Sequence, residues 1–153
     1  MVRMNAVPPE TAKRWSEMEM PEVPKGAWVT PKPLKDMRVA IISSAGLHPK
    51  KDRPFFRGEA DYRTIPADVS RDDLYMSHVS SNFDRVGLQE DINVAFPVDR
   101  LRELADEGFI GSVATNHFSF MGATDPTQMK EKVGEVADKL RADKVDTLVL
   151  AGV

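Results

Sequence analysis

The 153-residue chain contains 41% hydrophobic and 29% charged residues, the balance of a folded globular protein rather than a disordered one. Its formal net charge is −3 with acids and bases mixed along the sequence, so it lacks the clustered basic stripe of a nucleic-acid groove. The absence of cysteine excludes disulfides, zinc thiolates and a cysteine nucleophile within these residues. No apolar run approaches the roughly 20 residues that span a bilayer, and no signal-peptide pattern opens the chain. We therefore expect a cytoplasmic protein that binds neither membrane nor nucleic acid.

The first 36 residues differ from the rest of the chain. A short helix is predicted from Pro9 to about Met18, because proline near a helix start and an acid in the first turn are both favourable. Continuous regular structure is then excluded by Pro21, Pro24, Pro31 and Pro33. We expect residues 1–36 to form a helix and an extended, proline-rich arm, and residues 37–153 to form the domain proper.

The domain begins with a nearly continuous apolar run at residues 38–44, which is typical of a strand buried on both faces of a parallel sheet. A loop with several glycines and prolines follows at residues 45–60. Short strands are predicted at 62–65 and 74–78. Residues 79–97 have no clear periodicity, and within them 91–96 fits either a strand or an ordered loop.

Two helices are clearer. Residues 97–108 place Leu101 and Leu104 on one face and end at a glycine, and residues 125–142 begin with Asp125-Pro126, a good N-cap followed by a good first position. A strand is expected between these helices, within 109–120, and another at 147–153. The alternation predicts an α/β layered, Rossmann-like domain with a mostly parallel sheet.

The final apolar strand permits two interpretations. Either it ends at the rim of the sheet with its carboxylate in water, or the domain is incomplete at the C-terminus, since a central strand of an α/β sheet is normally followed by a helix. The pattern alone leaves both open.

The three histidines, His48, His78 and His117, all fall at or near a predicted strand end. Ligands of open α/β sheets bind beyond the carboxyl ends of the strands, where a histidine can relay protons near neutral pH. We take them as candidate catalytic residues, against the alternative that each only hydrogen-bonds a loop. They do not have the helical i, i+4 spacing of a metal site.

Polar residues in the irregular region are candidate substrate contacts. Arg63 and Arg85 can clamp a carboxylate with paired donors, and Asp84 and Asn93 lie in the same part of the chain. Surface ion pairing is the competing interpretation of each. Several serines lie near the histidines, so a serine hydrolase stays open, but no arrangement specifies one.

Several stretches together resemble one family. They are Ser43-Ser44-Ala45-Gly46-Leu47-His48, Asp61-Tyr62-Arg63-Thr64-Ile65-Pro66, Met76-Ser77-His78 with Asn82-Phe83-Asp84, residues 91–104, Gly108-Phe109-Ile110-Gly111-Ser112-Val113 and His117-Phe118-Ser119-Phe120-Met121-Gly122. In this order and spacing they resemble the selenoprotein B subunits of glycine, sarcosine and betaine reductases and the matching D-proline reductase subunit. The resemblance runs from about residue 27 to the end of the sequence.

The resemblance implies an oxidoreductase subunit that reductively cleaves a C–N bond of an amino acid or an N-methylated derivative. A selenocysteine, ionised at neutral pH and strongly nucleophilic, does this work in the family, just after a strand similar to residues 145–150. The resemblance also implies a partner subunit whose pyruvoyl group activates the substrate amine, a dithiol reductant and an oligomeric assembly. This chain has neither selenocysteine nor cysteine, so no cofactor is expected within it and the 153 residues alone are expected to be inactive.

A non-catalytic function is the alternative hypothesis. On that hypothesis the chain is a complete α/β module that binds a small anion or a partner protein.

Selenocysteine is encoded by UGA, which a gene caller reads as a stop. We therefore predict that the codon after Val153 is UGA, that the reading frame stays open beyond it, and that a cysteine codon follows in the U-x-x-C arrangement of the family. The nucleotide sequence past codon 153 tests this. A UAA or UAG codon, or a frame that closes at once, would leave the binding-module hypothesis in its place.

Overall fold

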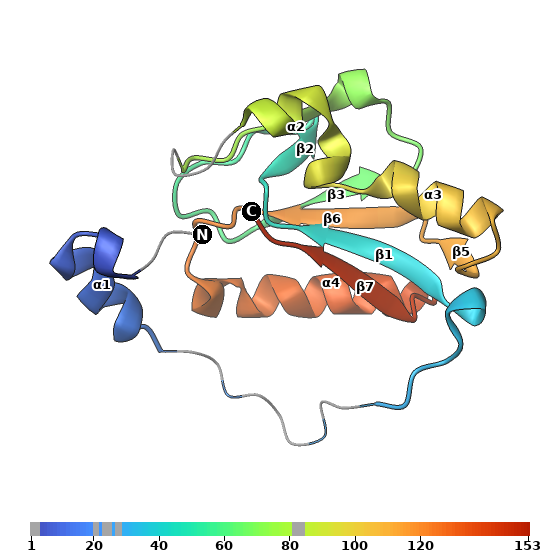
Figure 1. Ribbon diagram of the computed structural model, residues 1–153, viewed down its shortest axis with the longest axis horizontal. Helices are drawn as coiled ribbons and strands as arrows, with labels where there is room; N and C mark the ends of the chain where they lie inside the picture. Colours follow the sequence, from blue (N-terminus) through green and yellow to red (C-terminus); the bar gives the residue numbers. More distant parts are fainter. Residues whose placement is uncertain (1–3, 20–21, 23–25, 27–28, 81–84) are drawn as a thin grey trace. The chain divides into compact units, whose positions relative to one another are not determined.

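The computed structural model describes residues 4–19, 22, 26, 29–80 and 85–153 (Figure 1). The chain forms two compact units, residues 1–30 and 31–153. The first contains a short 3₁₀ turn, Met4–Ala6, and helix α1, Pro9–Ser16, which has a proline in its first turn and Glu10 beside it. The helix predicted at Pro9 is thus confirmed. None of the described helices is long and apolar enough to cross a membrane.

The second unit is built on a five-stranded sheet with β1, Arg38–Ser43, at its centre. Along one side β1 pairs in parallel with β5, Ser112–Val113, and then with β6, Asn116–Phe120. Along the other side it pairs in parallel with β7, Thr147–Ala151. Strand β3, Tyr62–Pro66, is antiparallel to β6. The α/β class is therefore confirmed, but the sheet is mixed, and the Rossmann-like, mostly parallel arrangement is not established.

The loop predicted after β1 contains a strand that the sequence did not reveal. Residues Leu47–Pro49 form β2, which pairs in an antiparallel ribbon with β4, Leu74–Met76. Two 3₁₀ turns, Leu34–Asp36 and Arg71–Asp73, precede β1 and β4. A three-residue strand carries too little periodicity to be recognised beside glycine and proline.

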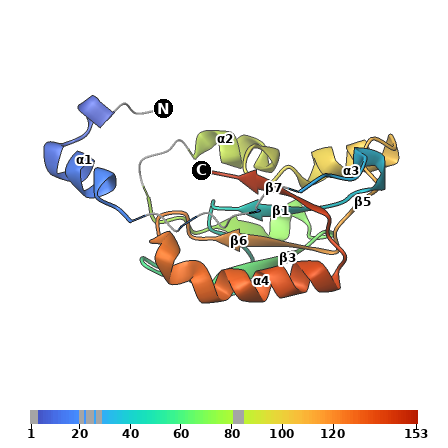
Figure 2. The ribbon, with the colours of Figure 1, turned by 90° about the horizontal axis from the view of Figure 1, so that it is seen from below.

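Three helices complete the described part of the unit: α2, Val86–Glu90, α3, Val98–Asp106, and α4, Lys130–Ala142. The predicted helix at 125–142 is divided, because Pro126–Met129 forms a 3₁₀ turn in front of α4, with the Asp125 carboxylate accepting from Thr127 N. The ambiguous residues 91–96 contain a 3₁₀ turn, Ile92–Val94, rather than a strand. Helix α4 lies on one face of the sheet, and α2 and α3 on the other (Figure 2).

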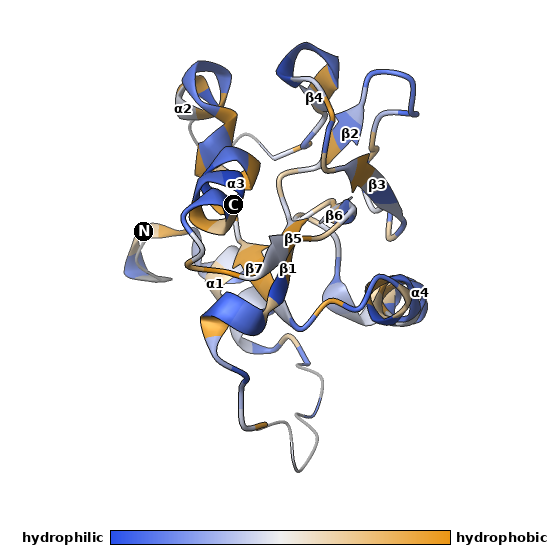
Figure 3. Ribbon diagram, turned by 90° about the vertical axis from the view of Figure 1, so that its right-hand side faces the viewer, coloured by the Kyte–Doolittle hydropathy of each residue, from blue (hydrophilic) through white to orange (hydrophobic). Residues whose placement is uncertain are grey.

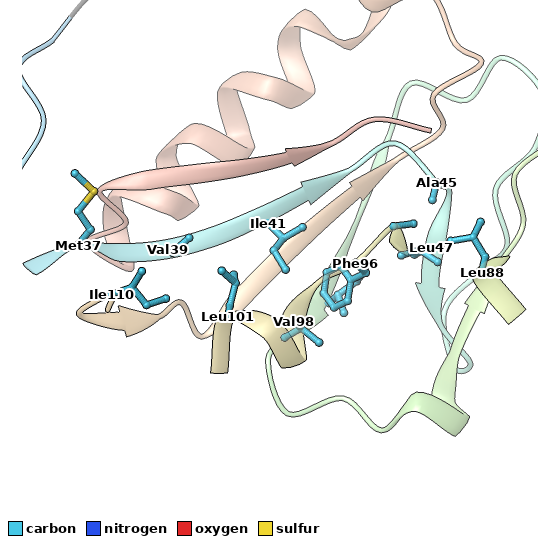
Figure 4. Packing of buried hydrophobic residues seen from close by; sticks show 12 residues of the cluster. Met37, Val39, Ile41, Ala45, Leu47, Leu88, Phe96, Val98, Leu101 and Ile110 are labelled. Carbon is cyan, nitrogen blue, oxygen red and sulfur yellow. The ribbon is translucent and has the colours of Figure 1, made fainter. Parts of the chain in front are cut away.

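Alternate residues of β1 serve the two faces. Val39 and Ile41 pack with Leu101 of α3, as Figure 4 shows, whereas Ala40 belongs to a second cluster with Val136 and Leu140 of α4. A strand whose side chains are buried on both faces must be apolar along its whole length. This is why β1 was the clearest strand in the sequence.

The strand beside β1 is interrupted between β5 and β6, and a histidine fills the interruption. The backbone N–H of Ile41 donates to Nδ1 of His117 at 3.0 Å, in place of a backbone carbonyl. The ring proton therefore sits on Nε2, which is buried without a hydrogen-bond partner among the described residues. The imidazole packs edge to face with the ring of Phe96, with 5.4 Å between the ring centroids. Burial lowers the pKa of His117 to about 4, so the side chain is neutral at pH 7.

A buried ion pair joins the loop before β3 to that strand. Nη2 of Arg63 lies 2.7 Å from the Glu59 carboxylate, and the two side chains are 8% and 3% exposed. Arg63 also donates to the carbonyl of Arg53 and its guanidinium covers the ring of Phe55. The Glu59 carboxylate also accepts from the Arg53 guanidinium and from the backbone N–H of Phe56. Glu59 therefore binds three residues between positions 53 and 63.

We predict that Glu59→Gln lowers the free energy of unfolding by about 3 kcal/mol, because it leaves the Arg63 guanidinium buried without a counter-charge. The matched control is Glu103→Gln, which removes one partner of the exposed Arg100–Glu103 pair. This control should change stability by less than about 1 kcal/mol. Urea unfolding of the two variants and the parent measures the difference, and equal losses would contradict the structural role of the buried pair.

Acidification should destabilise the protein through His117. The unfolded chain takes up a proton near the ordinary histidine pKa of about 6.5, whereas the folded chain does so only near pH 4. Stability is therefore lost as the pH falls from about 6.5 to about 4, by roughly 3 kcal/mol from this residue. In His117→Asn, which keeps an acceptor for Ile41 N, the fall between about pH 7 and pH 4.5 should be smaller by a similar amount. An unchanged pH dependence of urea unfolding would show that His117 is not the group responsible.

Candidate functional site

The parallel strands β1, β6 and β7 end together, and a crevice of about 440 Å³ opens there on the α4 side of the sheet. Its walls come from the three strand ends and from the 3₁₀ turn and first turn of α4. They consist of Ile42, Ser43, Ser44, Phe120, Gly122, Thr124, Pro126, Met129, Val133, Leu150, Ala151 and Gly152. The carboxyl ends of parallel strands are where α/β sheets bind ligands, so this crevice is the candidate site.

Ser44 holds the three strand ends together. Its backbone N–H donates to the carbonyl of Ala151 at 3.0 Å, and its carbonyl accepts from Gly122 N at 2.9 Å. Its hydroxyl accepts from the backbone N–H of Val153 at 2.9 Å. The approach is so close that a Cβ on Gly122 would meet the Ser44 carbonyl oxygen at 2.7 Å. Only glycine fits at residue 122 without moving the rim of the crevice.

The crevice is apolar, with hydroxyl groups as its polar side chains. Among the described residues that line it, none has an ionisable side chain. The Thr124 hydroxyl donates to the carbonyl of Glu59, which connects the crevice to the buried ion pair of the 53–63 loop. Such a wall suits the carbon skeleton of a small ligand, while a charged group of that ligand would need partners from elsewhere.

Two of the three predicted histidines belong to the β2–β4 part of the fold, His48 within β2 and His78 two residues after β4. His48 is buried in β2, where its Nδ1 donates to the Pro49 carbonyl at 2.9 Å and its ring stacks on Tyr75. His78 follows β4, and its Nδ1 accepts from the backbone N–H of Ser80. Burial, and then the nearby Arg85 guanidinium, lower the pKa of His78. Gly46, at φ +64°, allows the close approach, since a Cβ there would lie 3.1 Å from His78 N.

His117 lies apart from these two, near the start of β6 and fully buried on the α3 face. Its Nδ1 accepts a hydrogen bond from the backbone N–H of Ile41, and its neutral ring packs against Phe96. The structure thus places His48 in the β2–β4 ribbon, His78 just after it and His117 inside the core. The catalytic role assigned to all three stays a prediction.

The predicted substrate contacts are engaged within the fold. The Arg63 guanidinium donates to the Glu59 carboxylate and to two backbone carbonyls. Arg85 donates to the carbonyls of His78 and Ser80. Asn93 bonds Asp99 at the start of α3, and its donors to Asp91 hold the pKa of that carboxyl below its usual range. Asp84 lies outside the described residues.

The predicted site residues that the structure describes do not line the crevice. Among the lining residues, Thr124 and Met129 carry no functional signal in the sequence, whereas Ser44 stands there as one of several serines near a histidine and as part of a family motif. Its place directly after the most apolar strand is a further signal. Within the described part of the chain, no cluster of three histidine or acidic side chains could hold a metal ion.

Comparison with known proteins places these features in a family. Residues 10–153 match the family model of glycine/sarcosine/betaine reductase selenoprotein B. The chain is 40% identical over 140 residues to D-proline reductase subunit gamma of Acetoanaerobium sticklandii, a match that covers 88% of the chain and 57% of that relative. No solved structure gives a significant match.

Two relatives from Peptoclostridium acidaminophilum are more distant. Glycine reductase complex component B subunit gamma is 29% identical over 127 residues, or 78% of the chain and 29% of the relative. Sarcosine reductase complex component B subunit beta is 30% identical over 133 residues, or 80% of the chain and 30% of the relative. The chain thus spans somewhat over half of the first relative and under a third of the other two. Since the family model matches nearly the whole sequence, the chain belongs to the glycine/sarcosine/betaine reductase selenoprotein B family.

Proposed function

We propose that this chain forms part of a reductase subunit that cleaves the C–N bond of a small amino acid or amine, of the glycine, sarcosine, betaine or D-proline type. The observation that carries the proposal is the family match over residues 10–153. The 40% identity to a D-proline reductase subunit, against 29% and 30% for the other two relatives, makes D-proline the first substrate to test.

The proposed reaction adds two electrons and two protons to the substrate. The C–N bond breaks, a C–H and an N–H bond form, and a dithiol is oxidised to a disulfide. The chain has no cysteine, so on this proposal the reacting selenol or thiol comes from polypeptide outside the 153 residues. A pyruvoyl group on a partner subunit would supply activation of the substrate amine.

The part assigned to this chain is to bind and orient the substrate. The apolar wall of the crevice, with Phe120 and Met129 from different elements, would hold the carbon skeleton and exclude water. The backbone around Ser44 and Gly122 fixes the separation of the three strand ends that form the rim. The relatives are named as subunits of reductases and reductase complexes, which supports action together with partner subunits.

A chimera tests the proposal directly. The matched stretch of the Acetoanaerobium sticklandii D-proline reductase subunit gamma is replaced by the corresponding residues of this chain, and the chimera is assembled with the other subunits of that reductase. Dithiothreitol-dependent consumption of D-proline is then measured, with glycine, sarcosine and betaine as further substrates. We expect turnover by the chimera and none by the 153-residue chain alone.

The variants Gly122→Ala and Gly134→Ala make a matched pair in this chimera. A Cβ at 122 strikes the Ser44 carbonyl, whereas a Cβ at 134, within α4, meets nothing within 4 Å. Displacing the rim by a fraction of an ångström should lower kcat/KM by about tenfold to a hundredfold, and Gly134→Ala should leave it unchanged. An assembled chimera without activity on the four substrates, or thiol-dependent turnover by the isolated chain, would contradict the proposal.

A further inference from the structure

A second, smaller cavity of about 80 Å³ lies on the α3 side of the sheet and shares no lining residue with the crevice. Figure 3, a view along the strands, shows α3 and α4 on opposite faces of the sheet. The residues that line this cavity all fall between positions 69 and 102, and none of them belongs to β7. The walls of the cavity therefore do not depend on where the last strand ends.

Most of the lining of this cavity is apolar. It includes Val69 and Ile92 and the buried side chains of Phe96 and Val98, which are 0% and 5% exposed. Roughly 10–15 Å³ of such space accommodates one water molecule, so the cavity holds a molecule of only a few heavy atoms. An apolar wall with a small number of fixed polar groups is typical of a site for a small organic ligand.

The polar groups of the lining are all charged: Arg71, Asp99 and Arg102. The two carboxylate oxygens of Asp99 accept from different donors, Nη1 of Arg102 and Nδ2 of Asn93. Nη2 of Arg102 donates to the carbonyl of Ala67. These hydrogen bonds hold the Arg102 guanidinium in a fixed orientation and pair its charge with Asp99.

Arg71 supplies the positive charge that the lining does not compensate. Its Nη2 donates to the carbonyls of Gln89 and Glu90, at 3.0 and 2.6 Å, where α2 ends. Its Nε and Nη1 have no hydrogen-bond partner among the described residues. The Asp91 carboxylate accepts from Asn93 and does not line the cavity. With two guanidinium groups and one carboxylate, the lining carries a net charge of +1.

We propose that this cavity binds a small aliphatic monocarboxylate, with its carboxylate at Arg71 and Arg102 and its hydrocarbon body against Phe96 and Val98. Guanidinium groups are the preferred partners of carboxylates, because their planar N–H donors match the carboxylate oxygens. A zwitterionic amino acid fits less well. Asp99 is the one carboxylate of the described lining, and each of its oxygens already has a donor, so an added ammonium group would lack a counter-charge.

Propionate is the probe, added at constant ionic strength to the complete 153-residue chain with labelled valine, leucine and isoleucine methyl groups. We expect saturable NMR shifts at Val69, Ile92 and Val98, with a Kd on the order of 1 mM, which is within reach of a ligand of this size. Propionamide has the same shape without the charge, and alanine adds an ammonium group. Each should bind at least about tenfold more weakly, because hydrogen bonds between charged partners are the stronger ones.

The variants Arg71→Gln and Arg100→Gln make a matched pair, since each removes one guanidinium but Arg100 pairs with Glu103 and does not line the cavity. Arg71→Gln should weaken propionate binding by about tenfold or more, and Arg100→Gln should leave it unchanged. Circular dichroism of both variants checks that the fold is kept.

The proposal is overturned if the methyl signals of the cavity show no saturable shift, or if propionamide or alanine binds as tightly as propionate. Unchanged affinity in Arg71→Gln would overturn it as well. Shifts at Val133 and Leu150 in place of the cavity residues would assign the ligand to the crevice, against the proposal. The reductase proposal is decided separately by turnover in the chimera, so the failure of one is distinguishable from the failure of the other.

Discussion

The position of β1 at the centre of the sheet is the constraint on which the rest of the second unit depends. Both edges of this strand are paired, with β5 and β6 on one side and β7 on the other, and both of its faces are covered by apolar clusters. The interruption between β5 and β6 would leave the N–H of Ile41 without an acceptor. The Nδ1 atom of His117 accepts this hydrogen bond, so the buried Ile41 N–H has a partner. The arrangement requires a neutral imidazole in the core.

The parallel alignment around β1 also creates the crevice. Because β6 and β7 run in the same direction as β1, three strand ends reach the same rim, and Ser44 connects them by hydrogen bonds through its backbone and its hydroxyl. The crevice is apolar because its walls are the same residues that continue the α4 cluster, such as Ile42, Phe120 and Met129. Its shape therefore depends on the packing of the core, and a change at Gly122 acts on both.

The buried ion pair and the buried Thr124 hydroxyl have structural partners inside the second unit. Glu59 and Arg63 fix the loop before β3, and Thr124 binds the Glu59 carbonyl from the crevice side. This connects the rim of the crevice to a buried ion pair, whose loss is expensive because it leaves an uncompensated charge. The buried Glu59–Arg63 pair thus stabilises the loop beside the crevice. The side chains of Leu148 and Leu150 in β7 are exposed among the described residues.

The sequence by itself determined the α/β class, β1, α3 and the family, because these are carried by local signals: a continuous apolar run, a helical stripe with a glycine stop, and motifs in a fixed order. It did not determine the strand β2, the antiparallel direction of β3 or the residues of the crevice. Strand direction and proximity depend on contacts between residues far apart in the chain, such as Ser44 with Gly122 and Val153. Histidine and arginine are candidate site residues by their chemistry. Only the tertiary structure shows that Arg63 pairs with the buried Glu59 and that His117 accepts from the buried Ile41 N–H, since burial is a property of the packed fold and not of the residue.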